Sequence, residues 1–488
     1  MAQFITAQEA ADLINDQATL GASGMGQTQW AEELCWALGK RYEETGRPKN
    51  ITFTHGGMLG DFNGRSITYL GKEGLVKRWM GALLGVAFDL LKLLQENKLE
   101  AYCLPLGVIN QLWCEIAAKR PGVITKVGLG TFVDPRIEGG KMNDVTTEDI
   151  VKLIELEGEE YLFYKSYPLD FAFIRGTTAD EDGNISMSKE SMKLDGLHLA
   201  QATRNSGGKV IVQVEWVAKS GTLHPKQVEI PGILVDYVVV ATRQEACWQT
   251  DGVYFNPAFN GDIKIPVKRI PELPLTERKV ITRRAAMELK PGVIINLGTG
   301  MPMDIPNIAN EENVSEILKM TTESGSCGGL PMPLPFFGSV YNAEALIESK
   351  AQFDFYDGGG IDIGFLGLAQ TDEEGNINVN KFGNRVMGIG GFINISQNAK
   401  KVVYCGTFTH GAELKIEDGK VIIVKEGKHK KFLKKVEQIC YSGKYAQQVK
   451  QQVLFITERG VLTLAEGQMT LSEIAPGIDL EKDLLSMM

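Results

Sequence analysis

Near-continuous apolar runs are the dominant pattern in the middle of this chain. Residues 171–174, 209–217 and 233–242 are apolar at most successive positions, so both faces of each predicted strand are largely hydrophobic. Strands of this kind are covered by helices on both sides, which is typical of a mainly parallel sheet. The pattern therefore predicts an open α/β architecture.

The N-terminal region alternates helix, strand and glycine turn. Thr6 and Glu9 have the spacing of a capping box at a helix start. A short strand over 18–20 leads into the glycine turn 21–26, and 28–38 is predicted as a helix. The apolar spacing of 74–96 predicts a long helix, followed by a strand over 100–104. A strand, a glycine loop and a helix together present backbone N–H groups to an anion.

The chain contains an internal repeat. The segments at 170–174 and 180–186 reappear at 362–366 and 372–378, with a constant offset of 192 residues. The Asp-Glu-x-Gly-Asn-Ile part alone could reflect shared turn chemistry, but the similar flanks favour duplication. A looser match relates Ala10–Gly26 to Ala285–Gly300, with an offset of 274 at the glycine turn. We therefore predict two tandem related open α/β domains, the first enlarged by roughly 80 residues.

Proline and glycine punctuate residues 255–274, where we place the domain boundary. The predicted domains are residues 1–265 and 275–488. A length of 488 residues fits two domains of ordinary size.

The net charge of −10 provides no extended basic surface, so neither nucleic acid nor an anionic membrane is an expected partner. The one basic cluster, Lys425–Lys435, is interpreted as a solvated face. The most apolar stretch, 80–94, is too short and too polar to span a bilayer.

Seven cysteines without a Cys-x-x-Cys pair indicate a reducing, cytoplasmic location. The five histidines lack the spacing of metal ligands, so no metal site is expected.

Candidate chemistry is concentrated in the second predicted domain. Glu323 ends a β-prone run and is followed at once by small residues. Further glycine turns lie at 298–300, 358–360 and 388–391. If these turns end neighbouring strands, they form one crevice with exposed N–H groups; tight packing of successive turns is the alternative. Dinucleotide binding competes weakly, because no complete Gly-x-Gly-x-x-Gly is present.

A carboxylate in such a crevice can act as a general base or as a nucleophile. Attack on a thioester carbonyl also needs paired N–H donors for the developing oxyanion. Cys327 is a rival nucleophile, but no histidine lies near it in sequence, and a packed core thiol is favoured. His410 is interpreted as a surface loop residue.

These features resemble family I coenzyme A transferases, most closely the single-chain propionate/acetate CoA-transferase type, in which two subunit-like halves are fused. The resemblance extends over most of the chain. The matching segments are 127–136, 281–302, Glu323-Ser-Gly, 353–360, 388–396, 404–408, 455–459 and 473–480.

The resemblance implies that Glu323 is the nucleophile of ping-pong chemistry through a glutamyl-CoA thioester. Coenzyme A would be co-substrate and covalent intermediate, with no permanent cofactor; acyl-CoA and short carboxylic acids would be the substrates of a homo-oligomer. The implied CoA and oxyanion residues are Gly298, Thr299, Gly300, Met301, Pro302, Gly388, Gly390 and Gly391. Of these, the Thr299 N–H is the first oxyanion donor, and Gly390 or Gly391 the second.

The chain departs from the family pattern near the implied substrate pocket. Leu106 precedes Gly107 where related enzymes commonly carry glutamine, and the first-half loop reads Ala-Ser-Gly24-Met25 instead of Ser-Gly-Phe. Residues 332–337 are also bulky and apolar. These differences lead to the hypothesis of a more apolar acyl group.

Two other functions share these features. An acyl-CoA hydrolase would deliver the same intermediate to water, and a metabolite sensor would only bind. Dependence on an acid acceptor separates transferase from hydrolase, and any CoA exchange excludes the sensor.

Overall fold

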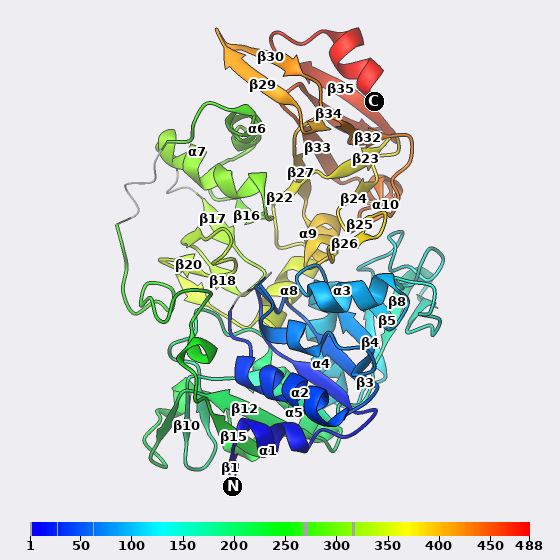
Figure 1. Cartoon of the computed structure of the whole chain (residues 1–488). Coiled ribbons are helices and arrows are strands. Elements are labelled where there is room, and N and C mark those ends of the chain that lie inside the picture. Colours follow the sequence, from blue (N-terminus) through cyan, green and yellow to red (C-terminus); the bar gives the residue numbers. More distant parts are fainter. Residues whose placement is uncertain (1, 27, 62, 267–271, 315–317) are drawn as a thin grey trace.

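The computed structural model describes residues 2–26, 28–61, 63–266, 272–314 and 318–488. We call the part up to residue 266 the first half and the part from residue 272 the second half. The two halves lie one above the other, with the N-terminus at one end of the molecule and the C-terminus at the other (Figure 1). Part of the predicted domain linker, residues 267–271, lies outside the described residues.

The first half is built on an eight-stranded sheet in the order β1-β15-β12-β9-β2-β3-β4-β5, in which every pairing is parallel. Its strands are β1 (Gln3–Ile5), β2 (Thr19–Ala22), β3 (Ile51–His55), β4 (Val76–Gly81), β5 (Glu100–Cys103), β9 (Phe171–Arg175), β12 (Lys209–Val214) and β15 (Tyr237–Val240). Its helices are α1 (Ala7–Asp12), α2 (Glu32–Thr45), α3 (Phe88–Gln95), α4 (Leu106–Ala117) and α5 (Gly196–Asn205).

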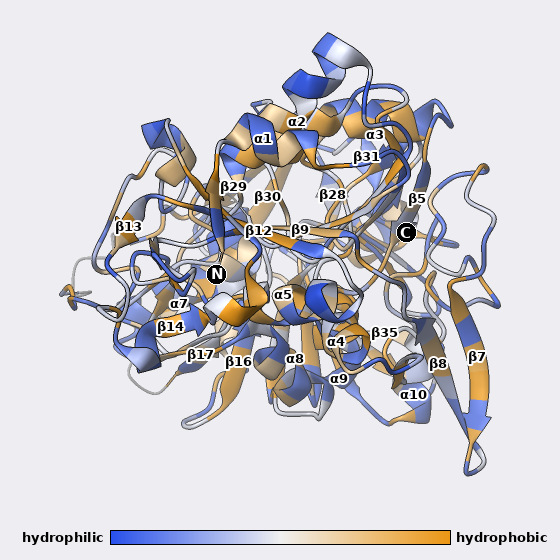
Figure 2. Cartoon of the chain, turned by 90° about the horizontal axis from the view of Figure 1, so that it is seen from below, coloured by the Kyte–Doolittle hydropathy of each residue, from blue (hydrophilic) through white to orange (hydrophobic). Residues whose placement is uncertain are grey.

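The apolar strands of this sheet lie between two layers of helices, as the sequence predicted. In Figure 2, β9 and β12 run between α1 and α2 on one side and α4 and α5 on the other. All five residues of β9 are buried. Burial on both faces explains why these strands are apolar at successive positions.

The second half is built on a nine-stranded sheet in the order β21-β18-β17-β16-β22-β27-β33-β34-β35. Its strands are β16 (Ile294–Leu297), β17 (Lys319–Thr321), β18 (Ser326–Cys327), β21 (Ala345–Leu346), β22 (Ile363–Gly367), β27 (Lys401–Cys405), β33 (Gln452–Ile456), β34 (Gly460–Ala465) and β35 (Gln468–Ile474). Its helices are α6 (Glu277–Ala286), α7 (Ile305–Glu311), α8 (Ser349–Asp357), α9 (Phe392–Asn398) and α10 (Gly443–Gln448).

Smaller sheets extend both halves. They contain β6 (Gly122–Thr125), β7 (Val151–Leu156), β8 (Glu159–Lys165), β10 (Thr178–Asp180), β11 (Ile185–Ser186), β13 (Trp216–Ala218), β14 (Val228–Ile230), β19 (Leu330–Pro331), β20 (Val340–Tyr341), β23 (Gln370–Asp372), β24 (Ile377–Asn378), β25 (Lys381–Phe382), β26 (Arg385–Val386), β28 (Thr409–His410), β29 (Glu413–Glu417), β30 (Lys420–Lys425), β31 (His429–Lys430) and β32 (Phe432–Leu433).

The predicted repeat is present in the structure. Strands β9, β10, β11 and β12 recur 192 residues later as β22, β23, β24 and β27. The central strand orders β15-β12-β9-β2-β3 and β33-β27-β22-β16-β17 correspond. Leu20 pairs with Phe171 and Ile295 with Ile363, so the strand register relates β2 to β16 with an offset of 295 − 20 = 275, one residue more than at the glycine turn. The repeated turn also keeps its hydrogen bonds, since Asp180 Oδ1 accepts from the Asn184 N–H and Asp372 Oδ1 from the Asn376 N–H. The prediction of two related open α/β units is confirmed.

Several element boundaries differ from the predictions. The expected helix over 74–96 is strand β4 followed by helix α3, because the apolar spacing of 76–81 also fits a strand buried between β3 and β5. Helix α2 begins at Glu32 rather than near Thr28, and ends at Thr45. The glycines at 358–360 follow helix α8 and precede β22, so they do not lie at the carboxyl end of a strand.

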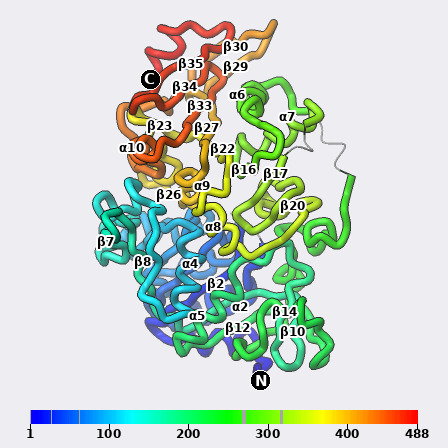
Figure 3. Tube along the Cα trace, turned by 180° about the vertical axis from the view of Figure 1, so that it is seen from behind, coloured from blue at the N-terminus to red at the C-terminus, as the bar shows by residue number. Residues whose placement is uncertain are grey.

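One hydrophobic core extends through both halves, and a second, smaller one lies within the second half. The larger core continues from the first sheet through Leu106, Ile109 and Trp113 of α4 to Phe353 and Ile393 of α8 and α9. Figure 3 shows α4, α8 and α9 together at this junction. No helix among the described residues is long and apolar enough to cross a membrane.

Candidate active site

A cavity of about 500 Å3 lies between the two halves. The first half contributes one wall, and the carboxyl ends of β16, β17, β22 and β27 contribute the other. Such strand ends are the usual ligand position in open α/β sheets. The first-half wall consists of Met25, Gly26, Met58, Leu83, Gly85 and Val86.

Glu323 lines this cavity from the tight turn between β17 and β18. The Gly325 N–H donates to the Thr322 carbonyl at 3.0 Å. Gly325 has φ +98°, and a Cβ there would lie 2.0 Å from the Ile347 carbonyl oxygen, so only glycine fits. The Ser349 hydroxyl donates to the Glu323 carbonyl at 2.8 Å. The turn is therefore held by close packing of Gly325 against Ile347 and by the hydrogen bond from Ser349 to Glu323.

The Glu323 carboxylate is surrounded by protein yet reachable through the cavity. Its Oε2 accepts one hydrogen bond, from the Gly391 N–H at 3.0 Å, and it forms no ion pair with any described residue. Burial raises the pKa of this carboxyl from 4.5 to about 7, opposed only by the Gly391 hydrogen bond. A poorly solvated carboxylate near its pKa at neutral pH suits nucleophilic or base chemistry.

Gly391 leaves no room for a side chain. A Cβ at this position would lie 2.2 Å from Glu323 Oε2 and 3.0 Å from the Phe353 ring. The φ of Gly391 is −84°, so the requirement for glycine is spatial rather than conformational. The close approach brings the N–H to the carboxylate.

The loop that carries Gly391 is attached to the first half. The Gly390 N–H donates to the Ala82 carbonyl at 2.8 Å, and the Gly85 N–H donates to the Met387 carbonyl at 2.7 Å. The Gly388 N–H donates to Asn380 Oδ1 at 2.7 Å. The N–H groups of Gly388 and Gly390 are therefore occupied. This geometry argues against Gly390 as an oxyanion donor and leaves Gly391.

Two further donors lie on the turn after β16. Gly298, Thr299, Gly300 and Met301 line the cavity, whereas Pro302 is buried and is not part of the described wall. The Gly298 N–H donates to the Phe365 carbonyl at 2.8 Å. The N–H groups of Thr299 and Gly300 have no acceptor among the described residues. They are available to an oxygen atom that develops negative charge in the cavity.

Of the predicted substrate-pocket residues, only Met25 lines the cavity; Gly24, Leu106 and Gly107 do not. Leu106 is 1% exposed, and its N–H donates to the Gly390 carbonyl at 2.9 Å. A Cβ on Gly107 would lie 2.5 Å from Asn394 Nδ2. The N-terminus of α4 packs behind the glycine loop, so Leu106 and Gly107 support that loop instead of touching a ligand.

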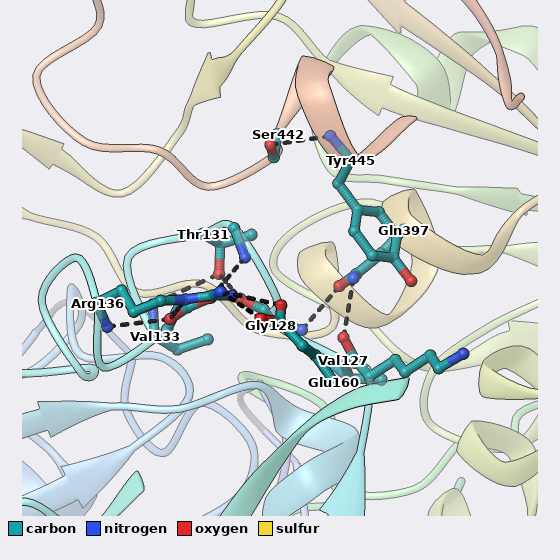
Figure 4. Close-up of polar contacts among 12 residues, drawn as sticks. Val127, Gly128, Thr131, Val133, Arg136, Glu160, Gln397, Ser442 and Tyr445 are labelled. Carbon is teal, nitrogen blue, oxygen red and sulfur yellow. Dashed lines mark hydrogen bonds and ion pairs between the residues drawn. The ribbon is translucent and has the colours of Figure 1, made fainter. Parts of the chain in front are cut away.

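The turn-rich segment 127–136 docks on the same part of the second half (Figure 4). The Gly128 N–H donates to Gln397 Oε1 at 2.7 Å, and Gln397 Nε2 donates to the Lys126 carbonyl at 2.9 Å. Gln397 belongs to α9, the helix that begins directly after Gly391. This contact holds α9 against the first half.

Sequence reasoning missed much of the cavity wall. The described lining residues include six methionines: Met25, Met58, Met301, Met303, Met332 and Met387. Met25 and Met301 had been named as site residues and Met332 as part of the apolar segment 332–337, whereas the other three had not. Scattered methionines give no local sequence signal. Arg278, which forms an ion pair with Asp304 at 2.7 Å, also lines the cavity.

Lys431 is a further correction, because it lines the cavity although it was assigned to a solvated face. The glycines at 358–360 are absent from the described wall, so three of the four predicted glycine turns contribute to it. Cys327 does not line the cavity; its thiol donates to Gln352 Oε1, and burial raises its pKa. His410 is exposed, as predicted.

Similarity to known proteins agrees with this geometry. The family model described as Coenzyme A transferase matches residues 4–241. A caffeate CoA-transferase of Acetobacterium woodii is 58% identical over 493 residues, covering 100% of this chain and 94% of that protein. The acetate CoA-transferase YdiF of Escherichia coli (strain K12) is 43% identical over 486 residues, covering 99% and 91%.

The fold match is equally extensive. The crystal structure of the acyl-CoA transferase YdiF from Escherichia coli O157:H7 in a thioester complex with CoA superposes with a TM-score of 0.93 at 42% identity, covering 100% of this chain and 92% of that one. With a relative at 58% identity over its whole length, the chain belongs to the single-chain family I coenzyme A transferases, which transfer CoA to carboxylates through a thioester intermediate.

Proposed function

We propose that Glu323 is the nucleophile of an acyl-CoA:carboxylate CoA-transferase. A carboxylate oxygen of Glu323 attacks the acyl-CoA carbonyl, and the carbon–sulfur bond breaks to give an acyl-glutamyl anhydride and CoA thiolate. The thiolate then attacks Cδ of Glu323 and expels the first acid, which leaves a glutamyl-CoA thioester. A second carboxylate reverses both steps and departs as acyl-CoA.

The observation that carries this proposal is the isolated Glu323 carboxylate among N–H donors in the cavity. Its partner is the Gly391 N–H, and the free N–H groups of Thr299 and Gly300 lie on the same cavity wall. In our proposal these donors stabilise the oxyanions of both tetrahedral intermediates.

We also propose a division into two domains, residues 1–265 and 275–488. The homo-oligomeric state and the cytoplasmic location stay predictions.

Intact-protein mass spectrometry tests the route. Brief incubation with butyryl-CoA is expected to add the mass of CoA less one water, and an added carboxylic acid is expected to remove it. If the CoA adduct disappears in buffer without acid as fast as it does with acid, the protein is instead a hydrolase. Absence of both an adduct and any CoA exchange would reject the covalent mechanism.

The pH dependence of the first half-reaction follows from the pKa of Glu323. Because burial raises this pKa to about 7, the reactive carboxylate is lost as the pH falls through that value. We expect kcat/KM for acyl-CoA to reach a plateau above pH 7 and to be roughly tenfold lower one unit below the pKa. A rapid-mixing measurement of adduct formation against pH checks this. A flat profile from about pH 5 to 8 would mean that another group limits the rate.

For the acid, we propose an apolar or aromatic carboxylate larger than acetate, rather than the propionate/acetate preference implied by the resemblance. The methionine-rich wall supports this, because thioether side chains adapt to varied shapes and make favourable contacts with aromatic rings. Leu334 and Phe337 add apolar surface. The relative at 58% identity is named for caffeate and the one at 43% for acetate.

A kinetic panel of acceptor acids tests this specificity. With butyryl-CoA as donor, kcat/KM is expected to be at least about tenfold higher for an arylpropenoic acid such as caffeate than for acetate, since each buried methylene contributes ~1 kcal/mol. A strong preference for acetate over butyrate and longer acids would contradict it. Acetate is the reference acceptor acid of the panel.

A further inference from the structure

One face of helix α4 contacts both segments of the second half that carry the reactive groups. The Leu106 N–H donates to the carbonyl of Gly390, the residue before the donor Gly391, at 2.9 Å. One turn later, Asn110 Nδ2 donates to the Ser349 hydroxyl oxygen at 2.8 Å. Residues four apart lie on the same face of a helix. In Figure 3, α4 lies beside α8, which begins at Ser349, and α9, which follows Gly391.

The first half orients Ser349 through two hydrogen bonds. The Ser349 N–H donates to the Leu194 carbonyl at 3.2 Å, and its hydroxyl oxygen accepts from Asn110. The single hydroxyl proton goes to the Glu323 carbonyl at 2.8 Å. Asn110 and Ser349 are each 1% exposed. A buried chain of two hydrogen bonds therefore connects α4 to the backbone of Glu323.

The amide of Asn110 forms this bond and leaves its acceptor unused. Because the Ser349 proton goes to Glu323, the Ser349 oxygen can only accept, so the amide nitrogen and not the amide oxygen faces it. Asn110 Oδ1 is buried and accepts from no described residue. An unpaired buried acceptor reduces stability, and an apolar side chain of the same shape would avoid this loss. A loss of stability beside a reactive group is typical of positions retained for function.

Gln111, the next residue of α4, makes a different contact with α8. Its Nε2 donates to Asp354 and Asp357 at 3.2 and 3.0 Å, near the other end of α8. Burial raises the pKa of Asp357 to about 6, opposed in part by the Gln111 amide. Among the described contacts, neither aspartate bonds to the turn that carries Glu323. Gln111 therefore joins the two halves without reaching the nucleophile.

We propose that Asn110 is a positioning residue that holds the turn of Glu323 through Ser349 and so keeps the carboxylate beside the Gly391 N–H. Asn110 does not line the described cavity wall, so it acts only through Ser349. The Ser349 bond restrains the backbone of Glu323, and the Gly391 bond restrains its carboxylate. Helix α4 holds both partners, so it fixes one relative to the other. The inference rests on the proposed function and assigns a first-half residue to the positioning of the nucleophile.

Asn110→Leu tests this role, because it keeps the shape of the side chain and removes its donor. With butyryl-CoA and a carboxylic acid, kcat is expected to fall about 10- to 100-fold, since a lost neutral hydrogen bond costs up to about tenfold and a ~1 Å misplacement about 100-fold. Calorimetric binding of free CoA is expected to stay unchanged. The unfolding midpoint is expected to stay the same or rise, because the unpaired acceptor is gone. Unchanged kcat, or a kcat loss accompanied by a lower midpoint, would overturn the proposal.

Gln111→Leu is the matched control, since it makes the same kind of change one residue later on the same helix. It is expected to lower the unfolding midpoint, because the buried carboxylate of Asp357 loses a donor, and to leave kcat unchanged. A similar loss of kcat in Gln111→Leu and Asn110→Leu would mean that docking of α4 in general supports the reaction. That result would contradict a specific role of Asn110.

A double-mutant cycle with Ser349→Ala tests the path from Asn110 to Glu323. Ser349→Ala removes the hydroxyl that both bonds share and is expected to reduce kcat at least as much as Asn110→Leu. In the Ser349→Ala background, Asn110→Leu is expected to cost no further activity, because no link to Glu323 is left to break. Additive losses would refute Ser349 as the link.

A stability measurement keeps the inference separate from the proposed function. Burial raises the pKa of Glu323 to about 7, so at pH 8 its charge destabilises the fold and Glu323→Gln should raise the unfolding midpoint. If Asn110 holds the carboxylate in its buried position, this rise should be smaller in the Asn110→Leu background. The other charged residues of the described cavity wall, Arg278 and Lys431, are the same in both backgrounds.

The two possible failures give different results. If wild type transfers no CoA but the rise is smaller in the Asn110→Leu background, the proposed function is wrong and the positioning role of Asn110 stands. An equal rise in both backgrounds would overturn the positioning role whatever the reaction.

Discussion

Glu323→Gln is expected to abolish the CoA adduct and to lower turnover by on the order of 10^4-fold or more, because the nucleophile of a covalent mechanism has no substitute nearby. Within the described wall of the cavity, Glu323 is the one carboxylate, and the Cys327 thiol lies outside it. Mass spectrometry after incubation with butyryl-CoA, together with steady-state rates, measures both effects. Turnover within about tenfold of wild type would exclude Glu323 as the nucleophile.

The same substitution is expected to stabilise the protein at alkaline pH. A carboxyl whose pKa rises from 4.5 in the unfolded chain to about 7 in the folded one favours folding below pH 4.5, and this stability is lost as the pH rises. Above pH 7 the buried charge costs up to ~3 kcal/mol. Glutamine removes this cost, so Glu323→Gln should unfold at a higher temperature than wild type at pH 8, with a smaller difference near pH 5.

A matched control tests whether the changes in activity and stability depend on the position of the removed carboxylate and not on the loss of one charge. Glu344→Gln removes an exposed carboxylate that pairs with Lys319 at 2.9 Å. Exposed pairs contribute little to stability, so activity and unfolding temperature are expected to match wild type. An inactive Glu323→Gln with a lowered unfolding temperature at every pH would indicate damage to the fold instead.

The sequence was sufficient for the architecture because the relevant signals are local or repeated. Apolar runs predicted the buried strands β9 and β12, and the constant offset of 192 residues predicted β22 as the counterpart of β9. The segment 74–96 was misassigned because apolar spacing in a short buried strand also fits one helix face. Long-range pairing of β4 with β3 and β5 decided its conformation, and no local pattern records that pairing.

The candidate site was predictable where one segment carries the chemistry. The carboxylate at 323 and the turn at 298–300 could be named from their flanking residues, whereas the N–H groups of Gly390 and Gly391 could not be distinguished. Contacts with residues about 300 positions earlier separate them: Ala82 takes the Gly390 N–H, which leaves Gly391 for Glu323. Lys431 was misread for the same reason, since its neighbours along the chain are exposed lysines.

Gly391→Ala is expected to lower kcat/KM by about 10^2- to 10^3-fold, although it adds a single methyl group. The new Cβ would lie 2.2 Å from Glu323 Oε2, so the carboxylate must move away and its hydrogen bond from the Gly391 N–H is lost. A misplacement of ~1 Å costs about 100-fold, and loss of an oxyanion donor costs a similar or larger factor. Gly358→Ala is the control, because Gly358 lies outside the described cavity wall and a Cβ there would approach only the Asp354 and Phe355 carbonyl oxygens, at 3.2 and 3.7 Å.

A double-mutant cycle with Glu323→Asp identifies the cause of the Gly391→Ala defect. Aspartate is shorter by one methylene, so its carboxylate lies farther from residue 391 and the added methyl no longer overlaps it. If the defect comes from this overlap, Gly391→Ala should cost much less in the Glu323→Asp background than in wild type, and the two losses should not add. Additive losses would mean that the methyl acts elsewhere, and contact with the Phe353 ring at 3.0 Å would then be the remaining explanation.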